Sequence, residues 1–162
     1  MKARDKIKSH AELKTICDAA RNRGGKIVFT NGCFDLLHIG HVRYLEDARR
    51  LGDMLIVAVN TDDSVRRIKG PDRPLVPESE RAEVLASLYC VDFVTLFDTS
   101  TPLPLIEFLM PDVLVKGADW PVDKIVGADV VLKNGGQVIP IELTRDRSTS
   151  SLIERILKRF SR

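Results

Sequence analysis

Residues 26–41 have the sequence KIVFTNGCFDLLHIGH, and this stretch decides the fold class of the chain. Its first part, Lys26 to Thr30, is a short β-branched and aromatic run that is typical of a buried strand. Asn31 to Asp35 is rich in residues that form turns. From about Ile39 to Leu51 apolar residues recur at helical spacing, and Gly52 closes that helix. A strand, a turn and a helix therefore follow one another as a βαβ unit requires.

The same order repeats along the chain, after a leading helix that starts at a capping box of Ser9 and Glu12. Further strands are expected at Met54 to Asn60, Phe93 to Phe97, Val113 to Lys116 and Gln137 to Ile141. Further helices are expected at Asp62 to Ile68, Glu78 to Tyr89, Leu103 to Met110, Gly127 to Lys133 and from near Ser148 onward. In the last helix, Ser151 and Glu154 are expected to form a second capping box.

Strands that are apolar on both faces and alternate with helices predict a parallel sheet covered on both sides. We therefore expect a Rossmann-like α/β fold, three αβα layers around a five-stranded parallel sheet, in a single domain over residues 1–162. In such sheets ligands bind beyond the carboxyl ends of the strands, where the strand order reverses.

Composition limits the classes of function. The 162 residues are 44% hydrophobic and carry 25 Lys and Arg against 23 Asp and Glu, a net charge of +2 that argues against a dedicated nucleic-acid binder. The longest apolar run, Met54 to Val59, is far shorter than the roughly 20 residues of a membrane helix. The charged first ten residues lack the apolar core of a signal peptide, and Cys17, Cys33 and Cys90 form no CxxC. We expect reduced thiols and a cytoplasmic protein.

Two histidines mark the candidate site. His38 and His41 lie three residues apart at the expected helix entrance, with Gly40 between them, and Gly32 allows the sharp turn before them. A helix N-terminus favours anions, and two imidazoles add hydrogen-bond donors at the same place. This pattern predicts phosphate binding.

Other interpretations of the pair remain open at this stage. The histidines could lie on a helix surface or pair with backbone carbonyls. Zinc would need a third ligand, and His10 is the one other histidine. A dinucleotide-dependent oxidoreductase would need a GxGxxG turn, which is absent, as is a Walker A loop.

At these residues the sequence resembles a known family. The HxGH element, within Gly32-x-Phe34-Asp35-x-x-His38-x-Gly40-His41, resembles the signature of the nucleotidyltransferase superfamily, which includes cytidylyltransferases and pantetheine-phosphate adenylyltransferase. The resemblance narrows to the D-glycero-β-D-manno-heptose 1-phosphate adenylyltransferases. It rests on residues 29–59, 69–74, 113–120, 134–136 and 148–150 and covers nearly the whole chain.

The resemblance implies a reaction and its catalytic residues. It implies transfer of AMP from ATP to D-glycero-β-D-manno-heptose 1-phosphate, giving pyrophosphate and ADP-heptose for lipopolysaccharide biosynthesis, with Mg²⁺ on the triphosphate. His38 and His41 would contact the triphosphate and stabilise the charge that develops as pyrophosphate leaves. Lys69 would place a cation on the phosphates.

The resemblance also implies binding residues. The nucleotide would be held by Thr30, Asn31, Gly32, Cys33, Phe34, Gly40, Lys116, Gly117, Asp119, Trp120, Ser148, Thr149 and Ser150. The acceptor would be held by Asp35, Arg73 and Arg81, although Asp35 also suits an Asx turn and Arg81 a plain surface position. No protein ligand for the metal is assigned.

Two departures and two alternatives qualify the resemblance. Many bacterial forms are fused to a sugar kinase, for which 162 residues leave no room, and Arg147 stands where a small residue is expected. A cytidylyltransferase acting with CTP, for instance on glycerol 3-phosphate, is one alternative, and a non-catalytic nucleotide-binding module is the other. The superfamily resemblance suggests a homodimer with small-molecule substrates and no nucleic-acid or membrane partner.

Overall fold

The computed structural model describes residues 2–118, 121–142, 144 and 148–161. Its strands are β1 (Ile27–Gly32), β2 (Met54–Asn60), β3 (Phe93–Phe97), β4 (Val113–Gly117) and β5 (Gln137–Ile141). Its α-helices are α1 (His10–Arg21), α2 (Ile39–Arg49), α3 (Asp62–Lys69), α4 (Glu78–Ser87), α5 (Leu103–Leu109), α6 (Ala128–Lys133) and α7 (Thr149–Phe160). Two short 3₁₀ helices are η1 (Ala3–Lys6) and η2 (Val122–Lys124).

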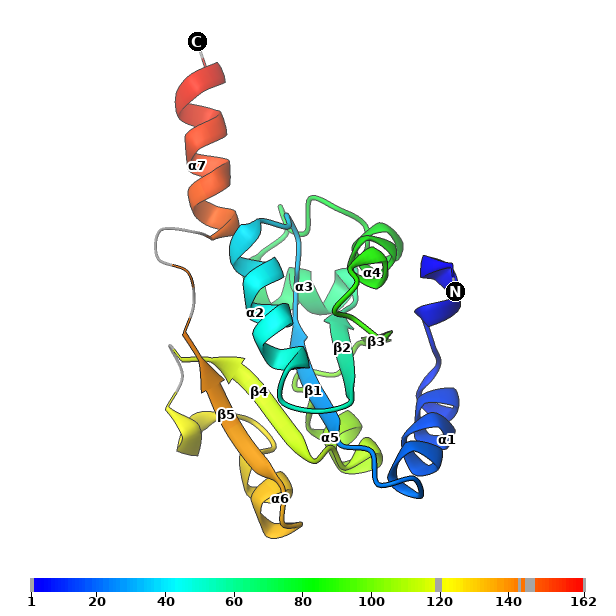
Figure 1. Ribbon diagram of the computed structural model, residues 1–162. Coiled ribbons are helices and arrows are strands. Elements are labelled where there is room, and N and C mark those ends of the chain that lie inside the picture. The colour runs from blue at the N-terminus through cyan, green and yellow to red at the C-terminus, as the bar shows by residue number, and fades with distance from the viewer. Residues whose placement is uncertain (1, 119–120, 143, 145–147, 162) are drawn as a thin grey trace.

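The five strands form one parallel sheet in the order β3-β2-β1-β4-β5 (Figure 1). The chain first builds outward from β1 through β2 to β3, then returns to the other side of β1 with β4 and β5. The strand order therefore reverses between β1 and β4, which is where α/β sheets bind ligands. The expected Rossmann-like αβα fold with a five-stranded parallel sheet is confirmed.

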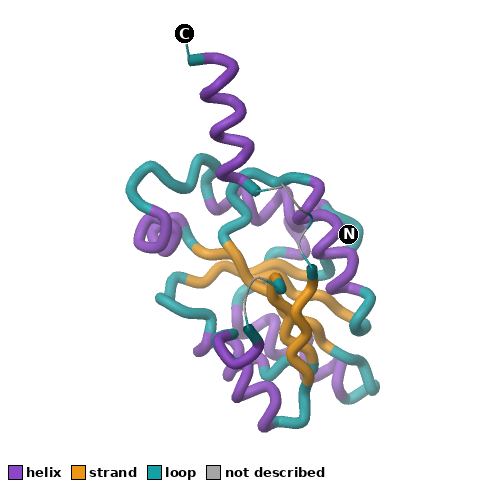
Figure 2. Tube along the Cα trace, turned by 90° about the vertical axis from the view of Figure 1, so that its left-hand side faces the viewer, coloured by secondary structure: helices purple, strands orange, loops and turns teal. Residues whose placement is uncertain are grey.

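Helices cover both faces of the sheet because each inner strand is apolar on both faces (Figure 2). On β2, Leu55, Val57 and Val59 pack in the cluster that contains α2 and α4 residues. The alternate residues of β2 pack on the other face with α1, α5 and α6. This sandwich fixes the strand ends that carry the site.

The first strand is longer than its local sequence predicts. It runs to Gly32 instead of Thr30, because Asn31 and Gly32 pair with Ala58 and Val59 of β2. Pairing with a neighbouring strand, which local propensity does not reveal, carries β1 two residues into the site.

The start of α7 also differs from expectation. The predicted box of Ser151 and Glu154 is wrong, because Ser148 has the extended backbone of an N-cap (φ −139°, ψ 158°). The Ser148 hydroxyl accepts a hydrogen bond from the Ser151 amide at 3.1 Å, and the Ser151 hydroxyl accepts one from the Ser148 amide at 3.2 Å.

Helix α7 projects beyond the body of the domain in both views (Figures 1 and 2). None of its residues is buried, and Ile156, Leu157 and Phe160 are 51%, 56% and 77% exposed. Across the described parts of the chain, no helix is long and apolar enough to cross a membrane.

Candidate active site

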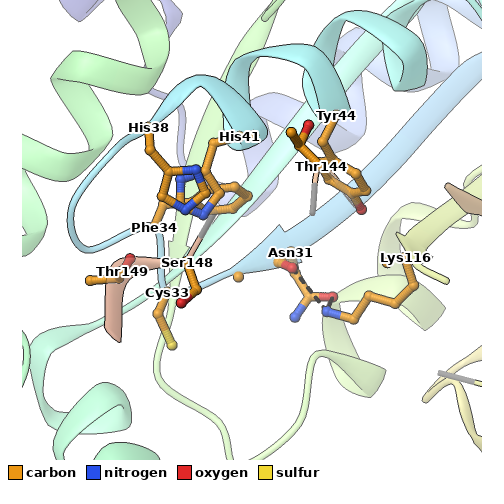
Figure 3. A pocket seen from close by; sticks show the side chains of 13 residues that line it. Asn31, Cys33, Phe34, His38, His41, Tyr44, Lys116, Thr144, Ser148 and Thr149 are labelled. Carbon is orange, nitrogen blue, oxygen red and sulfur yellow. Dashed lines mark hydrogen bonds between the residues drawn. The ribbon is translucent and has the colours of Figure 1, made fainter. Parts of the chain in front are cut away.

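A cavity of about 270 Å³, the first cavity, opens at the carboxyl ends of β1 and β4 (Figure 3). It is lined by Asn31, Gly32, Cys33, Phe34, His38, Gly40, His41, Tyr44, Lys116, Gly117, Thr144, Ser148 and Thr149. These residues come from the end of β1 through the first turns of α2, the end of β4, the segment between β5 and α7, and the start of α7. Most of the nucleotide-binding residues proposed from the sequence are therefore brought together in one cavity.

The cavity exists because β1 and β4 separate. Their registered pairs are Val28 with Val113 and Phe29 with Leu114, although both strands continue toward their carboxyl ends. Beyond that point Lys116 crosses between the strands, and its Nζ donates to the Asn31 carbonyl at 2.9 Å and to Asn31 Oδ1 at 3.0 Å (Figure 3). The ammonium group is thus held at the point where the strand order reverses.

His38 and His41 stack above this point. His38 is the N-cap of α2 and His41 its third residue, so the two rings lie on one face, with centroids 3.9 Å apart and planes at 22°. The ring of Phe34 meets His41 edge-on at 5.3 Å and 60°. Stacking and aromatic contact hold both imidazoles at the helix entrance, where first-turn amides favour an anion.

The surroundings of His41 favour its neutral form. Burial, and secondly the neighbouring His38, lower the pKa of His41 from 6.5 to about 4. Its buried Nδ1 has no hydrogen-bond partner among the described residues. A buried ring nitrogen of this kind is normally satisfied by a ligand or by water, so it marks the place of a polar ligand.

The turn before the histidines depends on Gly32 and Phe34. Phe34 has a left-handed backbone (φ 46°), which is uncommon for a bulky residue and is typical of functional sites. A Cβ on Gly32 would lie 3.0 Å from the Phe34 ring. The glycine therefore lets the aromatic ring lie under His41.

Two lining residues, Tyr44 and Thr144, were not anticipated from the sequence. Tyr44 follows His41 by three residues on α2, a spacing that places both on one face, and its hydroxyl bonds Thr30 Oγ1 at 2.7 Å. Thr30 is itself fully buried, so it supports Tyr44 instead of lining the cavity.

The start of α7 supplies Ser148 and Thr149 but not Ser150. Ser148 both caps the helix and lines the cavity. Thr149 Oγ1 donates to the Leu36 carbonyl at 3.2 Å and so joins α7 to the β1–α2 segment. Ser150 is exposed and is not among the lining residues.

Asp35 has a different role from the one expected. Its side chain is 1% exposed, and it accepts hydrogen bonds from Arg73 Nε at 2.6 Å and from the amides of Leu75 and Val76 at 2.8 and 2.9 Å. Its partners lie far along the chain, so it forms no Asx turn. Both of its carboxylate oxygens are engaged within the protein, so neither faces an acceptor substrate. Arg73 is occupied in the same contact. Together they fasten the α3–α4 loop to the β1–α2 segment.

Arg81 is a buried anchor, neither a surface residue nor one that faces a phosphate. Its side chain is 0% exposed. Its guanidinium donates to the carbonyls of Cys33, Asn60 and Val76 and pairs with Asp62 at 2.8 Å. One side chain therefore ties together the ends of β1 and β2 and the α3–α4 loop.

Lys69 lies in a second cavity of about 300 Å³. Its lining is Asn31, Gly32, Cys33, Asn60, Ile68, Lys69, Ser100, Thr101, Pro102, Lys116, Lys124, Ile125 and Val126. Asn31, Gly32, Cys33 and Lys116 line both cavities and form their shared wall. Burial raises the pKa of the Cys33 thiol in that wall, against the opposing effect of cations led by Lys69.

Asp119, Trp120 and Arg147, which the sequence also singled out, lie outside the described residues. Within the described ranges, no group of three or more His, Cys, Asp or Glu side chains is arranged to hold a metal ion. The zinc interpretation of the histidine pair therefore gains no third ligand from this part of the chain.

The family model for cytidylyltransferase-like proteins matches residues 29–155. The chain belongs to the cytidylyltransferase-like family. The matched range contains both cavities and the histidine pair, and it confirms the superfamily resemblance noted in the sequence.

Among curated proteins, the chain is 54% identical over 155 residues to bifunctional protein HldE of Syntrophotalea carbinolica, covering 96% of this chain and 32% of that protein. It is also 54% identical over 151 residues to bifunctional protein HldE of Geotalea uraniireducens, covering 93% and 31%. The chain thus spans about a third of the length of these relatives.

Solved structures agree with the fold. The lipopolysaccharide core biosynthesis protein from Thermoplasma volcanium superposes with a TM-score of 0.60 at 29% identity, covering 76% of this chain and 100% of that one. Pantothenate synthetase from Thermus thermophilus gives a TM-score of 0.58 at 18% identity, covering 87% and 63%, and supports the fold alone.

Asp35→Asn tests the loop anchor. We expect the free energy of unfolding to fall by about 1–3 kcal/mol at pH 7, because buried donors lose a charged acceptor. Although burial opposes it, the hydrogen bonds from Val76, Leu75 and Arg73 lower the pKa of Asp35 in the folded state, so its stabilisation is lost as pH falls through that pKa. Urea unfolding from pH 7 to pH 3 measures both effects. Asp123→Asn, at an exposed carboxylate, is the control, and equal stability of the two variants contradicts the assignment.

His41→Asn tests the neutral histidine. Because the folded protein binds this proton only near pH 4 and the unfolded chain near pH 6.5, wild-type stability should rise with pH across that window. The variant should lack this contribution, whereas His10→Asn, at an exposed position, should retain it. Denaturant titrations at pH 4.5, 5.5 and 7 measure the difference. Parallel pH profiles of wild type and His41→Asn would refute a depressed pKa.

Proposed function

We propose that this chain is an adenylyltransferase that transfers AMP from ATP to D-glycero-β-D-manno-heptose 1-phosphate, giving ADP-heptose and pyrophosphate. Similarity over 96% of the chain to bifunctional HldE proteins supports the proposal, as does the 29% identity to a lipopolysaccharide core biosynthesis protein. The later sequence motifs favour the heptose enzyme over other members of the superfamily.

The observation that carries the proposal is the set of donors in the first cavity. One cavity is lined by three kinds of group: the stacked imidazoles at the start of α2, the Lys116 side chain between the ends of β1 and β4, and the hydroxyls at the start of α7. Three separate segments thus present donors and a cation to one ligand. A triphosphate is the ligand whose length and charge match such an array.

The reaction needs little acid–base chemistry from the protein. An oxygen of the acceptor's phosphate, already anionic at neutral pH, attacks the α-phosphorus of ATP and forms the new P–O bond. The bond from that phosphorus to the bridging oxygen breaks, and pyrophosphate leaves with the electron pair. Catalysis then comes from alignment of the reactants and neutralisation of charge.

Seven residues of the first cavity have a proposed part in this step. His38 and His41 donate to the β- and γ-phosphates and stabilise the departing pyrophosphate. Asn31, Gly32 and Lys116 hold the α-phosphate region, and Ser148 and Thr149 hold the far end of the triphosphate. Lys69 contributes a cation from the adjoining second cavity. Asp119 and Trp120 remain proposed contacts for the ribose and base.

Mg²⁺ fits this site as part of the substrate. Asp35, the carboxylate of the HxGH segment, is occupied by Arg73 and two amides, so the ligands that suit Mg²⁺ here are the phosphate oxygens of ATP itself. We propose MgATP as the species that binds. ATP supply and the three free cysteines accord with a cytoplasmic location, and we propose no nucleic-acid or membrane partner.

Pyrophosphate release tests the function. Wild-type protein with Mg²⁺ and the heptose 1-phosphate should turn over ATP faster than CTP. His41→Ala should lower kcat by about 10²- to 10³-fold while the Kd for ATP changes little, because the imidazole acts chiefly as charge develops. Faster turnover with CTP would overturn the adenylyl assignment. Equal losses in ATP binding and turnover would indicate a nucleotide-binding module.

We also propose a homodimer. The exposed apolar residues Ile156, Leu157 and Phe160 of α7 give the domain a surface suited to a second copy. Light scattering should give a mass of about twice 18.1 kDa at micromolar concentration. Ile156→Asp should shift the mass toward one copy, whereas Leu132→Asp, at an exposed position on α6, should not. A wild-type mass of a single copy contradicts the proposal.

A further inference from the structure

The second cavity is unexplained by the nucleotide site. It adjoins the first cavity at the four residues that line both, and its other lining residues end β2 or follow β2, β3 and β4 at the same edge of the sheet. Its volume of about 300 Å³ is at the lower end of the range for small-molecule sites. A transferase needs a second substrate beside the first, in contact with the same reacting atoms.

The charged side chains that line the second cavity are lysines, within the part of the chain that the structure describes. Lys69 ends α3, Lys124 ends η2, and Lys116 lines the first cavity as well. Lys124 lies 3.9 Å from Asp123, but both side chains are at least 70% exposed, so that pair holds the ammonium weakly. Lysines around one cavity suit a phosphate dianion.

The remaining lining suits a sugar. Ser100 and Thr101 offer hydroxyls, and the turn that carries them is held by a hydrogen bond from Thr99 Oγ1 to the Thr101 carbonyl at 2.7 Å. The Asn60 amide also lines the cavity, but it donates to Ser64 Oγ at 2.9 Å. Opposite them, Pro102, Ile125 and Val126 form an apolar surface. A sugar ring presents hydroxyls at its edge and C–H groups on its faces, and such a mixed lining complements both.

The positions of the two cavities also suit an in-line displacement at the α-phosphorus. The histidines and the start of α7 line only the first cavity, where pyrophosphate would leave, and Lys69 and Lys124 line only the second. An attacking oxygen held by those lysines and a leaving group held by the histidines would then lie at different places around the α-phosphorus, as an in-line transfer requires.

We propose that the acceptor binds in the second cavity, with its phosphate between Lys69 and Lys124 and its sugar hydroxyls against Ser100 and Thr101. This assignment rests on the proposed function. It replaces Asp35, Arg73 and Arg81 as acceptor contacts, because those side chains are engaged within the protein.

Steady-state kinetics with Lys124→Ala and Thr101→Val test the assignment. We expect the KM for the heptose 1-phosphate to rise by about 10- to 100-fold in Lys124→Ala and less in Thr101→Val, with the KM for ATP within about twofold of wild type. Lys124→Arg should restore most of the affinity, and Lys133→Ala, an exposed lysine outside both cavities, is the matched control. Thermal melts check that each variant folds.

A rise in the KM for ATP with an unchanged acceptor KM would overturn the assignment, because the nucleotide base would then occupy this cavity. Unchanged constants in all variants would overturn it as well. Calorimetric titration of the heptose 1-phosphate into wild type and Lys124→Ala separates this outcome from failure of the proposed function. Lys124-dependent binding without ADP-heptose formation supports the subsite and rejects the reaction.

Discussion

Pairing between β1 and β4 stops at Phe29 and Leu114, and the site depends on that separation. A sheet whose strand order reverses at β1 has no crossover helix over the junction at that edge, so the two strands diverge into a crevice. Lys116 spans the crevice by bonding Asn31, and this contact makes one wall serve two cavities. The two cavities therefore adjoin at residues whose positions this contact helps to fix.

Two buried charged groups hold the loops around this wall. Asp35 accepts from Arg73 and two backbone amides, and Arg81 donates to three carbonyls and pairs with Asp62. Each is satisfied by several partners, which is the condition under which a buried charge is tolerated. The strand ends are therefore held by side chains that do not themselves face either cavity, which leaves the lining residues available to substrates.

Local sequence was sufficient for most of the fold and for the centre of the site. Apolar runs of strand length alternate with helical spacing, so element type and sheet class follow from periodicity. HxGH spacing places His38 and His41 on one face because they begin a helix. The roles of Asp35 and Arg81 did not follow, because their partners lie up to 48 residues away and are brought near by the sheet.

The same limit explains the smaller differences. Ser148 and Ser151 are each followed, three residues later, by a residue that can complete a capping box. The extended backbone at Ser148 makes it the N-cap. Ser100, Thr101 and Lys124 belong to no recognisable motif, and they join Lys69 only because loops after neighbouring parallel strands share one edge. Which residues line a cavity of this kind depends on the positions of the strands in the sheet, and these are a property of the tertiary structure.

The surroundings of the stacked histidines affect when His41 carries a positive charge. Burial and the neighbouring His38 lower the pKa of His41, so this pocket disfavours the charged form of the ring. A phosphate group placed beside the imidazole favours that charged form. In the proposed reaction, the positive charge of the ring would therefore develop together with the negative charge of the departing pyrophosphate.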